Sequence, residues 1–137
     1  MAALDTNLLV RFLVEDDAAQ LAAARRLIRK CVNAGETLFV PVTVSLELEW
    51  VLRSSFGFSK SVVIQTLAQL LASVELSFES EGALEVALVL YGQSSGQSSV
   101  YFSDCLHIAL SSRAGESPLW TFDRAASKLE GARLLAS

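Results

Sequence analysis

Cysteine and histidine, which supply zinc ligands and the nucleophiles and bases of covalent catalysis, are scarce in this sequence. Its 137 residues include two cysteines and one histidine. Neither Cys31 nor Cys105 has a second Cys or a His at the spacing of a zinc finger, so neither a Cys/His metal site nor a disulfide framework is expected. We expect both residues to be reduced, mostly buried thiols, as is usual in the cytoplasm.

Positive charge and long apolar runs are also lacking. Eleven Lys and Arg stand against 15 Asp and Glu, a net charge of −4, which argues against a broad basic surface for nucleic acid. One short basic run, Arg25, Arg26, Arg29 and Lys30, is either a solvated helix face or a contributor to phosphate binding. Apolar stretches such as residues 86–90 are interrupted well before the roughly 18 residues of a membrane span. The N-terminus lacks the features of a secretory signal, so we expect a cytoplasmic protein.

The composition that remains suits one hydrophobic core. Apolar residues make up 52% of the chain and charged residues 19%, which is enough to bury a core and too apolar for disorder. The length lies within the single-domain range of roughly 100 to 200 residues. We therefore expect residues 1–137 to form one domain.

Short apolar runs alternate with longer segments of helical periodicity. Strands are predicted at residues 2–4, 37–40, 74–78 and 119–121, with a possible edge strand at 133–135, and helices at 8–13, 18–33, 43–55, 59–72, 81–90 and 103–113, with a short helix near the C-terminus. Asp17 is the predicted N-cap of helix 18–33, and Gly35 is predicted to end it. This alternation is typical of a three-layer α/β/α fold with a central, mainly parallel sheet of four to five short strands.

Two segments carry further expectations. Residues 92–99 are the only low-complexity stretch and are predicted to be a mobile surface loop. The helix at 43–55 has one apolar face that includes Leu48 and Leu52 and a second that includes Leu46 and Trp50, so burial on both sides is expected. The second face could be covered by the next helix or by a partner protein.

Four acidic residues stand where an α/β protein binds its ligands. Asp5 and Asp123 each follow a predicted strand, and ligands bind beyond the carboxyl ends of parallel strands. Asp104 opens a helix, and Glu47 lies on the helix after the second strand. Taken singly, each has a structural explanation as a cap, a first-turn acid or a surface residue. Helical geometry alone does not choose between Glu47 and Glu49.

Taken together, the four acids suggest a cation. Carboxylates that converge without bases repel one another, so such a cluster is tolerated mainly when a cation holds it. Thr6, Asn7 and Thr121 lie beside the acids and either orient them through hydrogen bonds or serve turn and cap chemistry. For His107 and Arg11, structural or surface roles are favoured over catalysis and phosphate binding.

Four segments, taken in order, resemble the motifs of the PIN-domain family. They are the apolar-Asp-Thr-Asn string at residues 2–7, Glu-Leu-Glu-Trp-Val-Leu-Arg at 47–53, Phe-Ser-Asp-Cys-Leu-His-Ile-Ala at 102–109, and Thr-Phe-Asp at 121–123. The chain looks most like the VapC-type toxins of bacterial toxin–antitoxin pairs.

The resemblance implies that Asp5, Glu47, Asp104 and Asp123 are the catalytic, metal-binding residues. It favours Glu47 over Glu49 because the family's glutamate begins the Glu-Leu-x-Trp-Val-Leu run. The implied cofactor is Mg²⁺, with Mn²⁺ as a substitute.

The implied activity is that of a metal-dependent endoribonuclease that hydrolyses RNA phosphodiester bonds. The implied partners are an RNA substrate, a second copy of the chain and a small antitoxin. Many relatives carry a further Asp where this chain has Tyr101, which leaves a second metal position open. A PIN-fold interaction module with little or no catalysis is the alternative. A haloacid-dehalogenase-type phosphatase is disfavoured, because it needs an Asp where this chain has Asn7.

Overall fold

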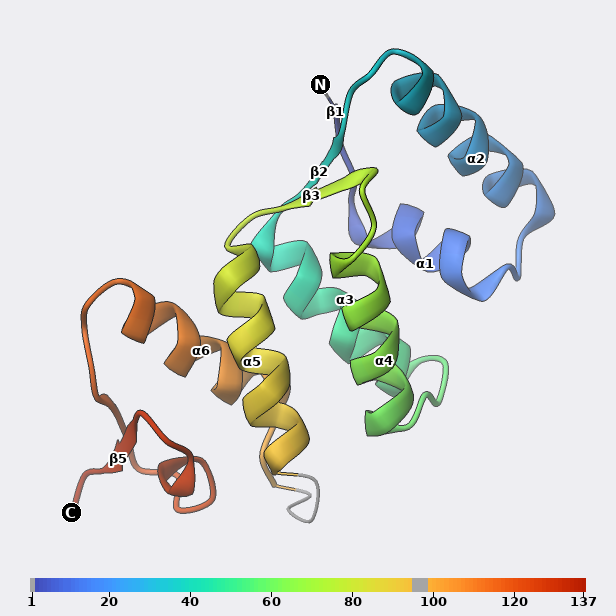
Figure 1. Ribbon diagram of the computed structural model, residues 1–137. Helices are drawn as coiled ribbons and strands as arrows, with labels where there is room; N and C mark the ends of the chain where they lie inside the picture. Colours follow the sequence, from blue (N-terminus) through green and yellow to red (C-terminus); the bar gives the residue numbers. More distant parts are fainter. Residues whose placement is uncertain (1, 95–98) are drawn as a thin grey trace. The chain divides into compact units, whose positions relative to one another are not determined.

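All strand pairs in the computed structural model, which describes residues 2–94 and 99–137, are parallel (Figure 1). The described residues contain five short strands. Helices of nine or more residues lie between the first four, and a three-residue 3-10 helix lies between the last two. The α/β fold with parallel strands that the sequence predicts is therefore confirmed.

The chain divides into two compact units. The first comprises Met1–Ser59 with Gln69–Glu79, and the second comprises Lys60–Ala68 with Ser80–Ser137. Each unit is described separately below. The prediction that residues 1–137 form one domain stays a prediction.

The first unit contains a three-stranded sheet in the order β1-β2-β3. The strands are β1 (Ala2–Ala3), β2 (Leu38–Val40) and β3 (Leu76–Phe78). The backbone N–H of Leu4 donates to the carbonyl of Phe39 at 2.9 Å, which extends the pairing of β1 with β2. Because β1 and β2 are parallel, the residues that follow them emerge at the same edge of the sheet.

The first unit also contains three complete helices, and capping residues set the ends of the second helix. They are α1 (Thr6–Val14), α2 (Ala18–Asn33) and α3 (Val42–Ser54). Asp17 caps α2, since its Oδ1 accepts from the backbone N–H of Gln20 at 3.0 Å. Gly35, with φ of 73°, follows the end of α2. Both predictions for the ends of α2 are confirmed.

The second unit is built around a helix pair and a two-stranded sheet. Its elements are α4 (Lys60–Leu71, of which Gln69–Leu71 belongs to the first unit), α5 (Glu81–Gln93), α6 (Phe102–Arg113), β4 (Leu119–Thr121), the 3-10 helix η1 (Ala126–Lys128) and β5 (Ala132–Leu134). Buried residues of α5 and α6 form its core, and the rings of Tyr91 and Phe102 lie 5.5 Å apart between centroids. The predicted edge strand at 133–135 is confirmed as β5, which pairs with β4.

The predicted loop at residues 92–99 is wrong at its beginning. Helix α5 continues through Gln93, because its buried face extends through Leu90 and Tyr91. Ser94 is also buried, and Lys60 Nζ donates to its carbonyl at 3.1 Å and its hydroxyl at 3.0 Å. Residues 95–98, the centre of the predicted loop, lie outside the described residues.

Helix α3 is buried on one face more than on the other. Leu48 and Leu52 are fully buried, whereas Trp50 is 59% exposed. The prediction of burial on both sides is therefore wrong for Trp50, because no described side chain covers most of its indole ring.

Two predictions from composition can also be compared with the structure. Cys31 and Cys105 are buried free thiols, as expected. Among the helices of the described chain, none combines the length and the apolar character needed to cross a membrane.

Candidate active site

Asp5 lies at the junction between β1 and α1. It is exposed, and its Oδ1 accepts from the backbone N–H of Leu8 at 3.0 Å, which makes it the N-cap of α1. Its other oxygen has no partner among residues 2–94 and 99–137. The next residue, Thr6, is buried, and its Oγ1 has no hydrogen-bond partner among the described residues.

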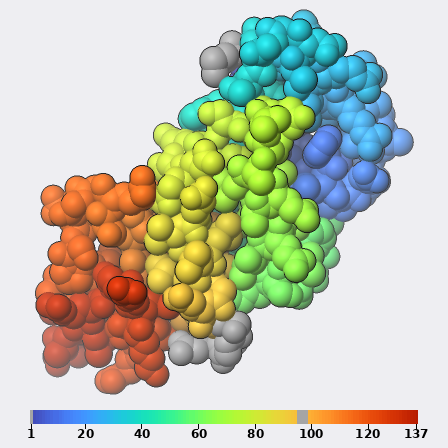
Figure 2. Space-filling model, viewed as in Figure 1, coloured from blue at the N-terminus to red at the C-terminus, as the bar shows by residue number. Residues whose placement is uncertain are grey.

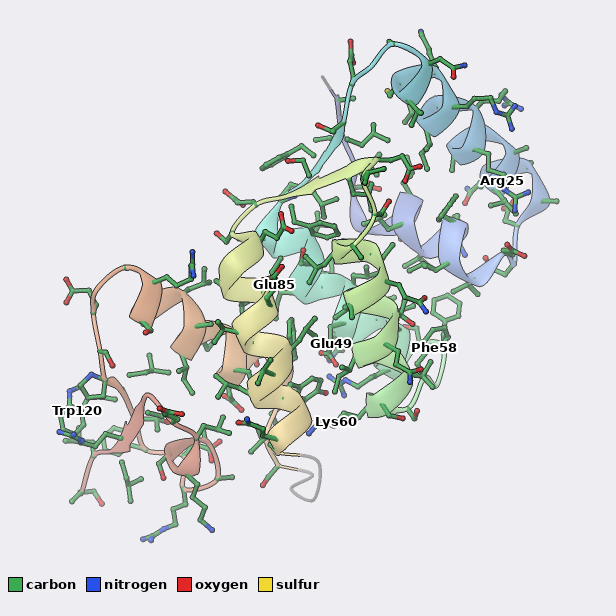
Figure 3. All side chains as sticks on the ribbon, viewed as in Figure 1. Arg25, Glu49, Phe58, Lys60, Glu85 and Trp120 are labelled. Atoms are coloured by element: carbon green, nitrogen blue, oxygen red, sulfur yellow. The ribbon has the colours of Figure 1, made fainter. Side chains whose placement is uncertain are left out.

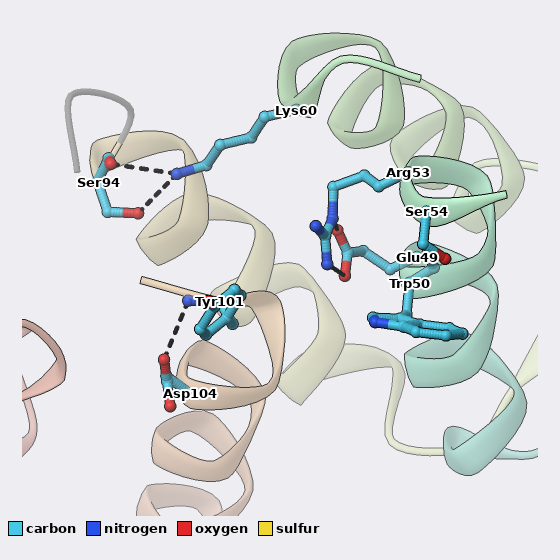
Figure 4. A network of polar contacts seen from close by, with 8 residues as sticks. All are labelled: Glu49, Trp50, Arg53, Ser54, Lys60, Ser94, Tyr101 and Asp104. Carbon is cyan, nitrogen blue, oxygen red and sulfur yellow. Dashed lines mark hydrogen bonds and ion pairs between the residues drawn. The ribbon is translucent and has the colours of Figure 1, made fainter. Parts of the chain in front are cut away.

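Helix α3 carries two glutamates in opposite environments. Glu49 is 1% exposed, and the guanidinium of Arg53 binds both of its oxygens, with Nη2 at 3.1 Å from Oε1 (Figure 4). Glu47 is exposed, and its carboxylate makes no hydrogen bond or ion pair with any described residue. Glu47 is therefore the α3 acid whose oxygens stay available to a ligand.

Asp104 lies in the first turn of α6 and is half-buried. Its Oδ2 accepts from the backbone N–H of Tyr101 at 3.0 Å (Figure 4). Tyr101 is 53% exposed. The second oxygen of Asp104 has no partner in the described part of the chain.

Asp123 follows β4 and organises the turn after it. Its Oδ1 accepts from the backbone N–H groups of Ala125 at 2.8 Å and Ala126 at 3.2 Å. The Thr121 hydroxyl accepts from the backbone N–H of Asp123 at 3.0 Å. Thr121 therefore fixes the backbone that carries Asp123, while Asp123 keeps one oxygen without a described partner.

The three aspartates share one arrangement. Each uses a single carboxylate oxygen to bind backbone N–H groups and leaves the other unpartnered within the described residues. A carboxylate has two acceptor oxygens, so the structural role and a ligand role are compatible. Glu15, Asp16 and Glu49 form ion pairs, whereas none of the four candidate acids pairs with a Lys or Arg of the described residues.

The four acids are divided equally between the two units. Asp5 and Glu47 belong to the first, where α1 and α3 are in contact and both follow parallel strands at one edge of the sheet. Asp104 and Asp123 belong to the second, where α6 contacts β4 and five residues join them.

Within residues 2–94 and 99–137, no three His, Cys, Asp or Glu side chains lie close enough together to hold a metal ion. Each unit contains only one pair of the candidate acids. The convergence of all four acids therefore stays a prediction.

Comparison with known families agrees with the resemblance seen in the motifs. The family model of the PIN domain matches residues 2–132, a range that contains all four acids. The chain belongs to the PIN-domain family. It is also similar to the VapC ribonuclease of Aquifex aeolicus (strain VF5), with 25% identity over 129 residues that cover 94% of this chain and 92% of that protein.

Two residues of this PIN domain that were considered for catalysis lie in different settings. The Arg11 guanidinium binds both Asp16 oxygens, at 2.6 and 2.7 Å, and Gln20 Oε1 at 2.8 Å. It is therefore engaged locally, as the favoured structural role predicts. His107 is exposed on α6, one turn after Asp104.

A cavity of about 380 Å³ lies between parts of α1 and α2, which also contact each other. It is lined by Asn7, Leu8, Arg11, Gln20, Ala23, Ala24 and Leu27. Asn7, which is exposed, thus lies next to the interface between the two helices.

The pairing of Glu49 with Arg53 was not predicted from the sequence. Its signal was present, because residues four apart in a helix lie on the same face and opposite charges attract at that spacing. Recognition of this pair would have separated Glu49 from Glu47 without any family resemblance.

Proposed function

We propose that this PIN domain is a metal-dependent endoribonuclease that hydrolyses RNA phosphodiester bonds, and that it is the toxin of a toxin–antitoxin pair. The proposal rests on the available carboxylate oxygens of Asp5, Glu47, Asp104 and Asp123. Each of these residues has at least one carboxylate oxygen without a partner among the described residues. All four lie within residues 2–132, which match the PIN domain.

The donor set of these four residues suits Mg²⁺ or Mn²⁺. Both ions prefer oxygen ligands, and Mg²⁺ keeps several of its waters. Asp5 and Asp104 would coordinate directly, and Glu47 and Asp123 directly or through water. When bound, the cation supplies an activated water and positive charge for the phosphate. Asp5 and Glu47 belong to the first unit, and Asp104 and Asp123 to the second.

The chain's own residues would hold these acids in place. The caps of α1 and of the turn after β4 fix one oxygen each of Asp5 and Asp123, which limits the rotation of both carboxylates. Thr121 restrains the backbone of Asp123. The unpartnered hydroxyl of Thr6 lies one residue from Asp5 and would orient it or a substrate oxygen. Asn7 would serve the same purpose from the exposed side of α1.

The same proposal includes two protein partners. Trp50 is 59% exposed on α3, and a large exposed aromatic side chain suits a protein interface, here with a second copy of the chain. The second partner is a small antitoxin that restrains the nuclease in the cytoplasm. The similarity to the VapC ribonuclease of Aquifex aeolicus supports an RNA substrate.

Substitution of two capping aspartates tests the nuclease proposal. Asp5→Asn keeps the cap of α1, because Asn caps a helix as well as Asp does. Asp17→Asn is the matched control, since Asp17 caps α2 with the same 3.0 Å bond and lies outside the proposed site. We expect the wild-type protein and Asp17→Asn to cleave single-stranded RNA with Mn²⁺, and Asp5→Asn to be inactive but folded.

Mn²⁺ titration by calorimetry accompanies the cleavage assay. We expect binding to the wild-type protein that Asp5→Asn weakens at least tenfold. A folded wild-type protein that neither binds Mn²⁺ nor cleaves RNA would instead be the interaction module. Equal cleavage by Asp5→Asn and wild type would remove Asp5 from the mechanism.

A further inference from the structure

The second half of α2 concentrates the positive charge of an otherwise acidic chain. Arg25, Arg26, Arg29 and Lys30 are four of its 11 Lys and Arg residues. At about 100° per residue they occupy one arc of the helix, and Arg26 and Lys30 are separated by about 6 Å along its axis. The buried residues Ala24 and Cys31 lie on the opposite side. We call these four cations the basic face of α2.

This face is open to solvent. All four residues are exposed. Helix α2 lies at the surface of the first unit (Figure 2, blue), and the Arg25 side chain extends away from the helix (Figure 3). Arg25 has one weak ion pair, at 3.4 Å to Glu15. The side chains of Arg26, Arg29 and Lys30 make no ion pair or hydrogen bond to any described residue.

A purely structural role explains this face poorly. Solvated helix faces usually mix charges of both signs, which attract at i,i+4 spacing, but α2 contains no Asp or Glu. Cations favour the C-terminal end of a helix through its dipole, but only within the last turn. Lys30 lies in that turn, whereas Arg25 and Arg26 precede it by at least one turn.

The helix that carries the basic face packs beside the helix that one of the proposed catalytic acids caps, and the basic face lies on the side of α2 opposite Ala24. Asn7 and Leu8 line the same cavity as Ala24 and Leu27. The middle of α2 therefore lies beside the first turn of α1, which Asp5 caps.

We infer that Arg26, Arg29 and Lys30 bind backbone phosphates of the RNA substrate on the strand that leads to the cleavage site. This inference rests on the proposed nuclease function and adds the means by which a chain of net charge −4 holds a polyanion. Arginine and lysine side chains bind phosphates without reading the bases, so this contact supplies affinity and not sequence preference.

The test measures RNA binding apart from cleavage. Fluorescence anisotropy follows a single-stranded RNA oligonucleotide bound to the Asp5→Asn protein in Mg²⁺, over a series of salt concentrations. The variant Arg26→Gln/Arg29→Gln/Lys30→Gln is added to this background, and glutamine keeps the helix propensity of α2. The control is Arg113→Gln/Lys128→Gln, which removes two exposed cations of the second unit.

Each phosphate contact on a single strand contributes about 0.7 to the slope of log K against log salt, so the triple variant should lower the magnitude of the slope by about 2. The control should leave it unchanged. The loss should be equal for RNAs of unrelated sequence.

Three outcomes would overturn the inference. The first is a salt slope that the triple variant does not change, and the second is an equal decrease of the slope in the control variant. The third is tighter binding of poly-glutamate than of RNA through the same three residues, which would assign the basic face to an acidic protein partner. Cleavage by the wild-type protein, assayed in parallel, separates the two proposals. RNA cleavage with an unchanged slope refutes only the role of α2, whereas absence of both cleavage and binding refutes the nuclease as well.

Discussion

Arg53 binds the buried carboxylate of Glu49 one turn away on α3, with Nη2 at 3.1 Å from Oε1. The carboxylate is 1% exposed and the guanidinium side chain 25% exposed, so the pair is only partly screened by solvent. Because Glu49 is buried and paired with Arg53, it stabilises the first unit. Glu47 is the exposed acid of α3.

Loss of Arg53 should destabilise the fold. Removal of one partner of a buried pair leaves an uncompensated charge, and we expect Arg53→Met to lower the free energy of unfolding by about 2 to 3 kcal/mol, less than for a fully buried pair. Urea denaturation measures this change. The double variant Glu49→Gln/Arg53→Met should recover most of the loss. No destabilisation by Arg53→Met would contradict the importance of the pair.

Glu47 should matter for activity and not for stability. Because its carboxylate has no described partner, Glu47→Gln should leave the urea midpoint unchanged. If Glu47 holds the cation, Mn²⁺-dependent RNA cleavage should fall by about 10- to 100-fold or more. Steady-state cleavage at saturating Mn²⁺ checks this expectation. Full activity of a folded Glu47→Gln protein would exclude it from the site.

The buried hydroxyls of Thr6 and Ser45, which have no hydrogen-bond partner in the part of the chain that the structure describes, offer a matched comparison. A buried polar atom without a hydrogen bond costs about 1 to 3 kcal/mol, so Thr6→Val and Ser45→Ala should each be neutral or stabilising. Only Thr6 adjoins a candidate acid, so only Thr6→Val should slow RNA cleavage, by about tenfold. Thermal unfolding and cleavage assays are run on both variants. Unchanged cleavage by Thr6→Val would assign its hydroxyl no catalytic role.

The position of Tyr101 should determine how many cations bind. It lies at the N-cap of α6, where Asp is also a favourable residue. We expect one Mn²⁺ for each wild-type chain and two for Tyr101→Asp, because the substitution adds a fifth acid three residues before Asp104. Calorimetric stoichiometry distinguishes these numbers. Two Mn²⁺ ions bound to the wild-type protein would show that binding of the second ion does not need an acid at position 101.

Much of the fold could be predicted because local signals marked its elements. Asp17 and Gly35 set the ends of α2, and Pro118 precedes β4 at the predicted position. Tertiary packing decided the rest. Helix α5 runs past Gly92, because Leu90 and Tyr91 continue its buried face and Lys60 binds the residue that follows it.

The candidate acids could be predicted from their places after strands and at helix starts, together with the PIN-domain motifs. The sequence could not distinguish Glu47 from Glu49 by periodicity, since both border the apolar stripe of α3. Burial and the contact with Arg53 separate them. The engagement of Arg11 by Asp16 was likewise invisible, because it depends on the turn between α1 and α2.

One buried thiol lies in each unit, Cys31 in the first and Cys105 in the second. A thiol reagent reaches such a side chain only when the surrounding structure opens, so the labelling rate of each cysteine reports the opening of its own unit. The two cysteines therefore report on the two units independently. Equal labelling rates across a denaturant series would mean that both units open in one cooperative transition, whereas unequal rates would mean that the units open separately.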